Sequence, residues 1–217
     1  MKNIRLFEGK PILLYPLGTA SESKLFSEIM VSTDDQAIAD VAQAHGASVP
    51  FLRSERNSDD HATIADVVTE VLAFYDKQGR HFDNICCLLP TAVFISVEII
   101  QEAYLKMQQE GLDSIFPVQR FTYPIERALW ISKASGKVKM IHPENLRARS
   151  QDLPDSYHDC GQFYWARTEA FKREGAFFGS NAGYVELSPL YVHDIDVEED
   201  WEMAEYKFKV LNDIKKF

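Results

Sequence analysis

Short strand-like runs alternate with longer helix-like runs along this chain, and this alternation limits its fold more than any other feature. The clearest helix has apolar residues at the spacing i, i+3, i+4, i+7, i+8 and i+11, namely Ile64, Val67, Val68, Val71, Leu72 and Tyr75. Short apolar runs at 29–33 and 84–89 stand on either side of it. Strands that alternate with helices predict a sheet covered by helices, so we expect an α/β fold with a doubly wound, mostly parallel sheet.

The remaining elements follow the same rhythm. Further helices are expected at 36–45, 97–110 and 168–173, and a last helix begins with the negative charges that suit a helix N-terminus, Glu198-Glu199-Asp200. We expect further strands at 114–118, 162–165, 184–187 and 191–196. The run at 84–89 is apolar on both faces, which is typical of a central, parallel strand. Its Cys86 and Cys87 should then point to opposite faces as small buried side chains.

An antiparallel excursion is expected at about 120–159, where the strand–helix rhythm stops. Two apolar runs, 128–131 and 137–141, flank Ser135-Gly136 and predict a β-hairpin. A polar stretch at 145–159 follows. Because it is too long for an ordinary connection, we interpret it as functional or interfacial.

Size and charge exclude several classes of protein. The 217 residues predict one domain, and 23 Lys and Arg against 33 Asp and Glu give a net charge of −10. We expect no nucleic-acid partner, because duplex phosphates attract basic surfaces. No apolar run approaches the ~20 residues of a membrane span, and we expect a cytoplasmic protein without a signal peptide. The absence of the motifs GxxxxGK[ST], GxGxxG, GxSxG and HExxH argues against P-loop enzymes, dinucleotide-dependent dehydrogenases and common hydrolases.

Two carboxylates near the end of the chain are the first candidate for chemistry. Asp194 and Asp196 lie two residues apart, so they share one face of the predicted strand at 191–196. They fall at its carboxyl end, where open α/β sheets bind ligands. Two oxygen ligands suit Mg²⁺, which takes its other ligands from water and substrate phosphates. The alternative is a strand-end turn that caps the next helix.

Several other polar groups have both a functional and a structural interpretation. Arg53 precedes the segment 58–63, where Ser58, Asp59 and Asp60 are expected to cap the helix at 64–75; free N–H groups there suit an anion. Arg147 and Arg149 can present a fork to a carboxylate or phosphate. The alternative for Arg53 and the segment 58–63 is a surface arginine and a capping loop. The alternative for Arg147 and Arg149 is solvated charge on a loop. His158 and Asp159 form either an acid–base pair or a satisfied loop pair.

Taken together and in order, these segments resemble the CMP-nonulosonic acid synthetases, the family of CMP-sialic acid synthetases, with the CMP-KDO synthetases as cousins. The matching segments are Lys2-Asn3-Ile4, Gly9-Lys10-Pro11-Ile12, Val31-Ser32-Thr33-Asp34-Asp35, Leu52-Arg53, Ser58-Asp59-Asp60-His61-Ala62-Thr63, Leu89-Pro90-Thr91-Ala92 and Asp194-Ile195-Asp196. The segments 149–153, 157–161 and 186–189 look most like the pseudaminic acid branch. The match is collinear over nearly the whole chain.

The resemblance implies a nucleotide-diphospho-sugar transferase type of fold and a reaction of CTP with a nine-carbon 2-keto sugar acid. CMP passes to the anomeric hydroxyl, and pyrophosphate leaves. It implies that Asp194 and Asp196 are catalytic and bind Mg²⁺. It places the nucleotide at Lys2, Asn3, Arg53, Asp60, Thr63, Pro90 and Thr91, and the sugar acid at Arg149, Gln151, Tyr157 and Gly161. It also implies a homodimer in which the excursion at 120–159 crosses into the partner's cleft.

The sequence departs from the family pattern in two places. Family members begin with a buried strand and a basic loop of the form A-R-x-x-S-K-R, and this chain starts at what matches the end of that region, Lys2-Asn3. We therefore expect an N-terminally truncated single domain over 1–217. Val93 stands where a second proline is frequent, and Leu89 stands where sialic acid enzymes commonly have glutamine, which favours another nonulosonic acid over sialic acid.

The sequence is compatible with an active cytidylyltransferase. The alternative is a truncated, non-catalytic homologue that binds nucleotide or sugar. A glycosyltransferase with a metal-binding DxD motif is disfavoured, because that motif usually lies in mid-chain.

Overall fold

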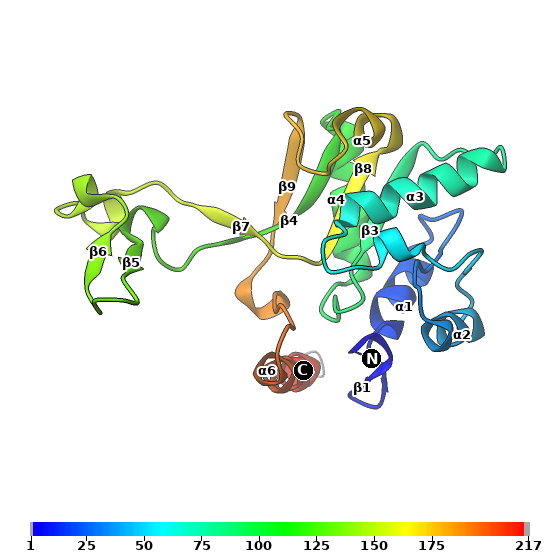
Figure 1. The fold of residues 1–217 in the computed structure, drawn as a ribbon, viewed down its shortest axis with the longest axis horizontal. Helices are drawn as coiled ribbons and strands as arrows, with labels where there is room; N and C mark the ends of the chain where they lie inside the picture. The colour runs from blue at the N-terminus through cyan, green and yellow to red at the C-terminus, as the bar shows by residue number, and fades with distance from the viewer. Residues whose placement is uncertain (1, 215–217) are drawn as a thin grey trace.

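The computed structural model describes residues 2–214, and its body is a sheet covered by helices on both faces. The sheet contains β3 (Asn84–Leu88), β8 (Phe163–Arg167), β4 (Ser114–Arg120) and β7 (Tyr157–Asp159) in that order, and β9 (Ala182–Glu186) also pairs with β4. The β4–β9 pair is parallel, and the other pairs are antiparallel. The expected α/β class is confirmed, with a mixed sheet (Figure 1).

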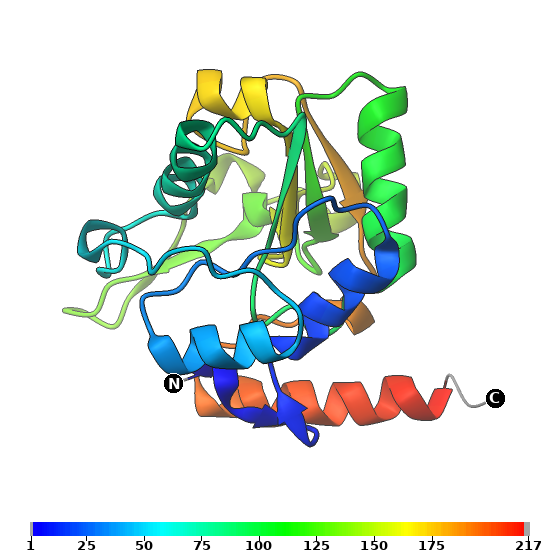
Figure 2. The same ribbon diagram turned by 90° about the vertical axis from the view of Figure 1, so that its right-hand side faces the viewer.

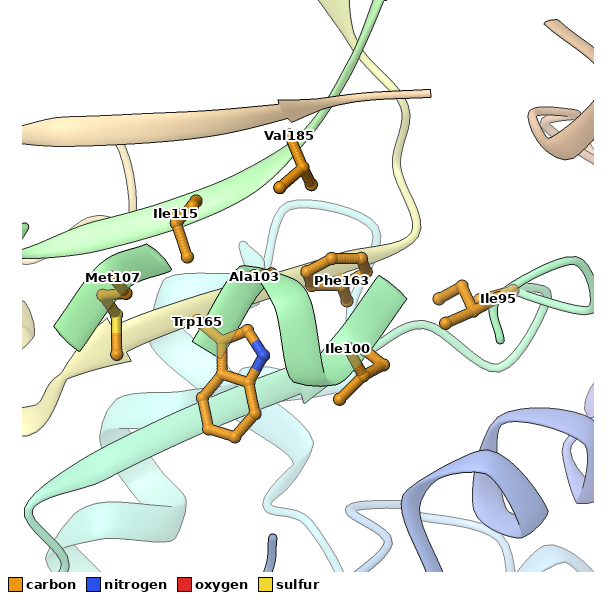
Figure 3. Close-up of a cluster of buried hydrophobic side chains, with 9 residues drawn as sticks. Ile95, Ile100, Ala103, Met107, Ile115, Phe163, Trp165 and Val185 are labelled. Atoms are coloured by element: carbon orange, nitrogen blue, oxygen red, sulfur yellow. The ribbon is translucent and has the colours of Figure 1, made fainter. Parts of the chain in front are cut away.

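Helices cover the two faces through separate apolar clusters. On one face α4 (Val97–Gln109) packs through Ile100, Ala103 and Met107 against Trp165 and its neighbours on the sheet (Figure 3). On the other face α3 (Ile64–Lys77) and α5 (Thr168–Glu174) cover a second cluster (Figure 2). Cys86 packs with the first cluster and Cys87 with the second. These cysteines therefore lie on opposite faces, as strand alternation predicts.

The remaining helices lie at the end of the sheet where β3 stops. They are α1 (Leu14–Ser23), α2 (Gln36–Ala44) and α6 (Glu198–Ile214), and a small hairpin of β1 (Leu6–Phe7) and β2 (Lys10–Pro11) lies beside them. Helix α6 buries Trp201, Ala204 and Leu211 with Phe7. The N-terminal segment and α6 thus share one cluster below the sheet (Figure 2). Among the described residues, no helix combines the length and the apolar character that crossing a membrane requires.

Two strand predictions are wrong. The segment 29–33 forms only a single parallel bridge, Met30 with Ser48. The segment 191–196 begins at the end of a 3₁₀ turn, Pro189–Tyr191. Residues 192–196 then form irregular chain before α6. Both segments contain the apolar residues expected of a strand, but a strand also needs a neighbour that satisfies its N–H and C=O groups, and no local pattern reveals that neighbour.

The outer edge of β3 is open, so the prediction of a central strand with a parallel neighbour is also wrong. The N–H of Leu89 donates to Gln162, and the carbonyl of Asp83 accepts from Thr168. Alternation along the strand therefore turns the backbone groups of Ile85 and Cys87 toward β8 and those of 84, 86 and 88 outward. No hydrogen bond from another described residue reaches these outward groups.

The expected excursion is an arm that extends away from the body (Figure 1). Its tip is a hairpin of β5 (Leu129–Ile131) and β6 (Val138–Met140), which confirms the predicted β-hairpin, and Gly136 turns it with a φ of 64°. β7 brings the chain back to β4. Large apolar side chains on the arm are exposed: Tyr123, Ile125, Leu129, Trp130, Ile131, Val138, Ile141 and Leu146. The arm therefore buries little apolar surface within its own chain.

Candidate functional site

The two predicted metal ligands lie on either side of a buried anchor. Ile195 is 1% exposed and packs with Val93, Phe94 and Trp201, whereas Asp194 and Asp196 are exposed. The carboxylate of Asp200, in the first turn of α6, accepts the N–H groups of Asp196 and Val197 at 3.0 Å. These hydrogen bonds hold the pKa of Asp200 below its usual value. The segment is therefore held by packing on one side and by a helix cap on the other.

Lys2 reaches the same segment from the beginning of the chain. It lies in a 3₁₀ turn, Lys2–Ile4, and its Nζ donates to the carbonyl of Ile195 and lies 3.8 Å from Oδ1 of Asp196. A pocket of about 270 Å³ opens here, lined by Lys2, Arg5, Ile195, Asp196, Val197, Glu198 and Trp201. The carbonyl of Asn3 accepts the N–H of Leu13, which ties the turn to the body. An ammonium and a carboxylate thus face each other at this pocket.

The Pro90-Thr91 turn follows β3 and leads to Val93 and Phe94. It follows the last bond of β3 to β8, and the carbonyl of Thr91 accepts the N–H of Val93 at 2.8 Å. Val93 and Phe94 belong to the cluster that buries Ile195. Among the predicted residues, Lys2, Asp194 and Asp196 therefore lie together beside this cluster, and the Pro90-Thr91 turn leads into the cluster from β3. We call this group the carboxylate site.

Arg53 belongs to a second group, before α3. Its Nη2 donates to Oδ1 of Asp34 at 3.1 Å, and its Nε donates to Oγ of Ser58 at 3.2 Å. Its own N–H donates to the carbonyl of Thr33. These bonds fix the direction of a guanidinium that is 24% exposed. Asp60 lies nearby on the exposed loop that leads into α3.

Thr63, and not Ser58, Asp59 or Asp60, caps α3. Its Oγ1 accepts the N–H of Asp66, and the Asp66 carboxylate accepts the N–H of Thr63, which forms a capping box. The bonds from Thr63 hold the pKa of Asp66 below its usual value. Asp59 instead accepts N–H groups of His61 and Ala62 in the preceding turn. The prediction erred because several residues in a row are good caps and only the helix start distinguishes them.

Thr63→Ala is expected to lower the free energy of unfolding by about 1 kcal/mol, because it removes one side of the capping box. The matched control is Thr69→Ala in the same helix, where the hydroxyl only donates back to the Ala65 carbonyl. Chemical denaturation of both variants measures the difference. Equal unfolding free energies for the two variants would contradict the role of Thr63 as the cap.

The predicted sugar-acid residues Arg149 and Gln151 lie on the arm, apart from the carboxylate site (Figure 1). Arg149 makes a two-pronged pair with Asp152, at 2.6 and 3.0 Å, beside a 3₁₀ turn, Ser150–Asp152. The carbonyl of Ala148 accepts from Arg127, which holds this turn against the arm. Within one chain, the structure does not bring these residues to Asp194 and Asp196.

Tyr157 and Gly161 lie where the arm returns to the sheet. Tyr157 begins β7, and its ring lies 6.2 Å from that of Tyr184. Gly161 has a φ of 58°, and its N–H donates to Oδ1 of Asp159 at 3.0 Å. The hydroxyl of Tyr164 donates to the other oxygen of Asp159. The carboxylate of Asp159 is therefore engaged on both oxygens.

His158 and Asp159 match the structural interpretation. Nδ1 of His158 lies 2.9 Å from the backbone carbonyl of Asp159, and its ring lies 4.8 Å from that of Phe121. The Asp159 carboxylate instead accepts from Gly161 and Tyr164, and within residues 2–214 no hydrogen bond joins it to this imidazole. Burial and the bond to Asp159 raise the pKa of the Tyr164 hydroxyl, which stays protonated at neutral pH.

The carboxylate site suits Mg²⁺ by its donor chemistry. Asp194 and Asp196 offer exposed carboxylate oxygens, and within residues 2–214 no third acidic, histidine or cysteine ligand completes a cluster with them. Mg²⁺ is commonly bound by one or two carboxylates together with water and substrate phosphates. The residues present therefore fit an ion that is completed by a phosphorylated substrate.

Sequence patterns did not single out Arg5, Glu198 and Trp201 as a unit. Arg5 makes a two-pronged pair with Glu198, and its guanidinium carbon lies 4.2 Å from the centre of the Trp201 ring. The bond to Arg5 holds the pKa of Glu198 below its usual value. A positive charge near one end of the chain and an acidic helix start near the other are the only local signals, and neither indicates that the two residues meet.

Comparisons with known proteins agree on one family. A family model described as Cytidylyltransferase matches residues 1–213. A pseudaminic acid cytidylyltransferase of Campylobacter jejuni is 35% identical over 209 residues, which cover 96% of this chain and 90% of that protein. A CMP-N,N'-diacetyllegionaminic acid synthase of Legionella pneumophila is 30% identical over 217 residues, which cover 97% of this chain and 90% of that protein.

A solved structure supports the fold. It is that of a CMP:2-keto-3-deoxy-manno-octonic acid synthetase in complex with CTP, which superimposes with a TM-score of 0.67 at 13% identity. The match covers 96% of this chain and 91% of that chain. At that identity the likeness establishes the shared fold alone.

Proposed function

The chain belongs to the cytidylyltransferase family, and on that premise we propose that it transfers CMP from CTP to the anomeric hydroxyl of a nonulosonic acid and releases pyrophosphate. Pseudaminic acid is the favoured acceptor. The observation that carries the proposal is the likeness to a pseudaminic acid cytidylyltransferase over 96% of the chain. The carboxylate site, where Lys2 faces Asp196, supports it because its chemistry fits a triphosphate and a divalent cation.

In the proposed reaction the anomeric oxygen forms a bond to the α-phosphorus, the bond to the bridging oxygen of pyrophosphate breaks, and the hydroxyl proton passes to solvent. Asp194 and Asp196 would hold Mg²⁺, which supplies charge neutralisation at the phosphates and acidifies the attacking hydroxyl. The Lys2 ammonium lies where it can attract the phosphates. Arg53 and the loop with Asp60 before α3 would hold the nucleoside, together with the Pro90-Thr91 turn.

A homodimer is part of the proposal. The arm carries exposed large apolar side chains, of which Trp130 is 54% and Tyr123 is 74% exposed. Exposed apolar clusters of this kind mark protein interfaces. Arg149 and Gln151 lie on this arm, so we place them, with Tyr157 and Gly161 at its base, on the sugar-acid side of the partner's site. Arg149 would face the carboxylate of the acceptor.

The test is a substrate screen with pyrophosphate release as the readout. CTP and Mg²⁺ are combined with pseudaminic, legionaminic, sialic or KDO acid, and the CMP-sugar is identified by mass spectrometry. We expect the largest kcat/KM with pseudaminic acid. Turnover only with another of these acids would contradict the favoured acceptor, and consumption of CMP-sugar in place of CTP would contradict the reaction.

The open outer edge of β3 favours one alternative, a non-catalytic homologue that binds nucleotide or sugar without turnover. An incomplete pairing of the sheet beside the Pro90-Thr91 turn would weaken the nucleotide side of the site. Calorimetric binding of CMP or of the sugar acid, without any pyrophosphate release from CTP, distinguishes this alternative from the enzyme.

A further inference from the structure

Arg5 connects two distant parts of the chain at the rim of the pocket beside Asp196. Its Nη1 and Nη2 donate to the two carboxylate oxygens of Glu198, both at 2.6 Å. Its guanidinium carbon lies 4.2 Å from the ring centre of Trp201, which is 2% exposed and so forms a fixed support. A two-pronged pair that also stacks on an aromatic ring restrains both the distance and the plane of the guanidinium, which a single surface ion pair does not.

The groups on either side of this contact belong to the carboxylate site. Lys2 lies three residues before Arg5, and Asp196 lies two residues before Glu198. The Arg5–Glu198 pair and the contact of Lys2 with Ile195 and Asp196 therefore close one ring of contacts around the pocket. Because both segments are short, the Arg5–Glu198 distance limits how far the Lys2 ammonium can move from Asp196.

We propose that Arg5 is a positioning residue, which holds the Lys2 ammonium beside the Asp196 carboxylate so that arriving phosphates meet both. The inference rests on the proposed function, since the phosphates and the cation belong to that reaction. A lysine held 3.8 Å from Asp196 repels a divalent cation as long as no phosphate is present to attract both charges.

The test measures Mn²⁺ binding to the free protein together with steady-state kinetics. Arg5→Ala is expected to bind Mn²⁺ about fivefold more tightly, because Lys2 is free to move away from Asp196. The same variant is expected to lose about tenfold in kcat, with little change in KM for the sugar acid, because the Lys2 ammonium is no longer held where the phosphates bind. A purely structural role would not strengthen Mn²⁺ binding while it slows turnover.

Four further variants and one control sharpen the test. Arg5→Lys keeps the charge but cannot form the fork, so we expect it to behave like Arg5→Ala. The charge exchange of Arg5→Glu with Glu198→Arg is expected to recover part of the lost kcat. Lys2→Met should also tighten Mn²⁺ binding. The double variant Lys2→Met with Arg5→Ala should bind Mn²⁺ as tightly as Lys2→Met alone. The control is Arg80→Ala, which removes another arginine that pairs with a carboxylate (Glu28) and lies over an aromatic ring (Tyr75), away from the pocket.

The outcomes separate this inference from the function on which it rests. Thermal unfolding verifies that each variant is folded. Additive effects of Arg5→Ala and Lys2→Met on Mn²⁺ binding, or unchanged Mn²⁺ binding in Arg5→Ala, would overturn the positioning role while the enzyme remains a cytidylyltransferase. Mn²⁺ binding that persists after Asp196→Asn would overturn the metal site itself, and this inference with it.

Discussion

Asp196→Asn is expected to lower kcat on the order of 10²-fold or more, with little change in the free energy of unfolding. The carboxylate is exposed, so the amide replaces it without leaving a cavity. The anchor of the segment, Ile195, and the cap at Asp200 are untouched, because that cap accepts the backbone N–H of residue 196 and not its side chain. The fall in kcat would come from the loss of the negative charge that holds the cation. Steady-state kinetics and chemical denaturation measure the two quantities.

Glu202→Gln is the matched control for this variant. It removes one carboxylate from the exposed side of α6, close in sequence to the site but outside the pocket. We expect its kcat to stay within about twofold of the unaltered protein, since a surface substitution of this kind has small effects. Normal turnover in Asp196→Asn would refute the assignment of this residue as a metal ligand.

Trp130→Glu on the arm is expected to weaken the proposed dimer by roughly 100-fold or more, because charge replaces a large aromatic side chain in the contact. Within one chain, Trp130 is half-exposed on β5, in the hairpin at the tip of the arm, so its replacement costs the monomer little stability. Sedimentation velocity over a range of protein concentrations measures the dissociation. We expect turnover to fall with the dimer fraction. Lys133→Glu, also exposed in this hairpin, is the control.

Mixing two inactive variants tests whether the arm completes the partner's site. Asp196→Asn damages the body of its own chain, and Arg149→Ala damages only the arm. If the arm crosses to the partner, each mixed dimer contains one intact site, and exchange of subunits should restore roughly a quarter of full activity. If each chain uses its own arm, both sites of every mixed dimer carry one lesion. No recovery after verified subunit exchange would therefore contradict the crossing arm.

Of the six α-helices in residues 2–214, the sequence by itself indicated five, because their signals are local, and it missed α1 at Leu14–Ser23. The apolar spacing at 64–75 and the acidic start at 198–200 each depend on residues within a few turns, and α3 and α6 appear where they predict. The turn at Gly136 is likewise encoded within a few residues. The collinear motifs carried the family, which the comparisons confirm.

Strand pairing was decided only in three dimensions. The segments 29–33 and 191–196 resemble strands in the sequence, yet neither forms a strand of the sheet. β3 is apolar on both faces, yet one of its edges is open. Whether a strand-like segment joins a sheet depends on which backbone groups lie opposite it, and those groups come from distant parts of the chain.

The composition of the site shows the same division. The sequence determined which residues carry charge: Asp194 and Asp196 two apart, Lys2 near the start, and Arg53 before a helix. Only the tertiary structure decided that Lys2 lies 3.8 Å from Asp196, that Arg5 clamps Glu198 over Trp201, and that Arg149 lies apart on an arm. The physical reason is that the burial of Phe7 and Ile195 with Trp201 in one cluster brings the two ends of the chain together. Such packing gathers residues by surface removed from water and not by distance along the chain.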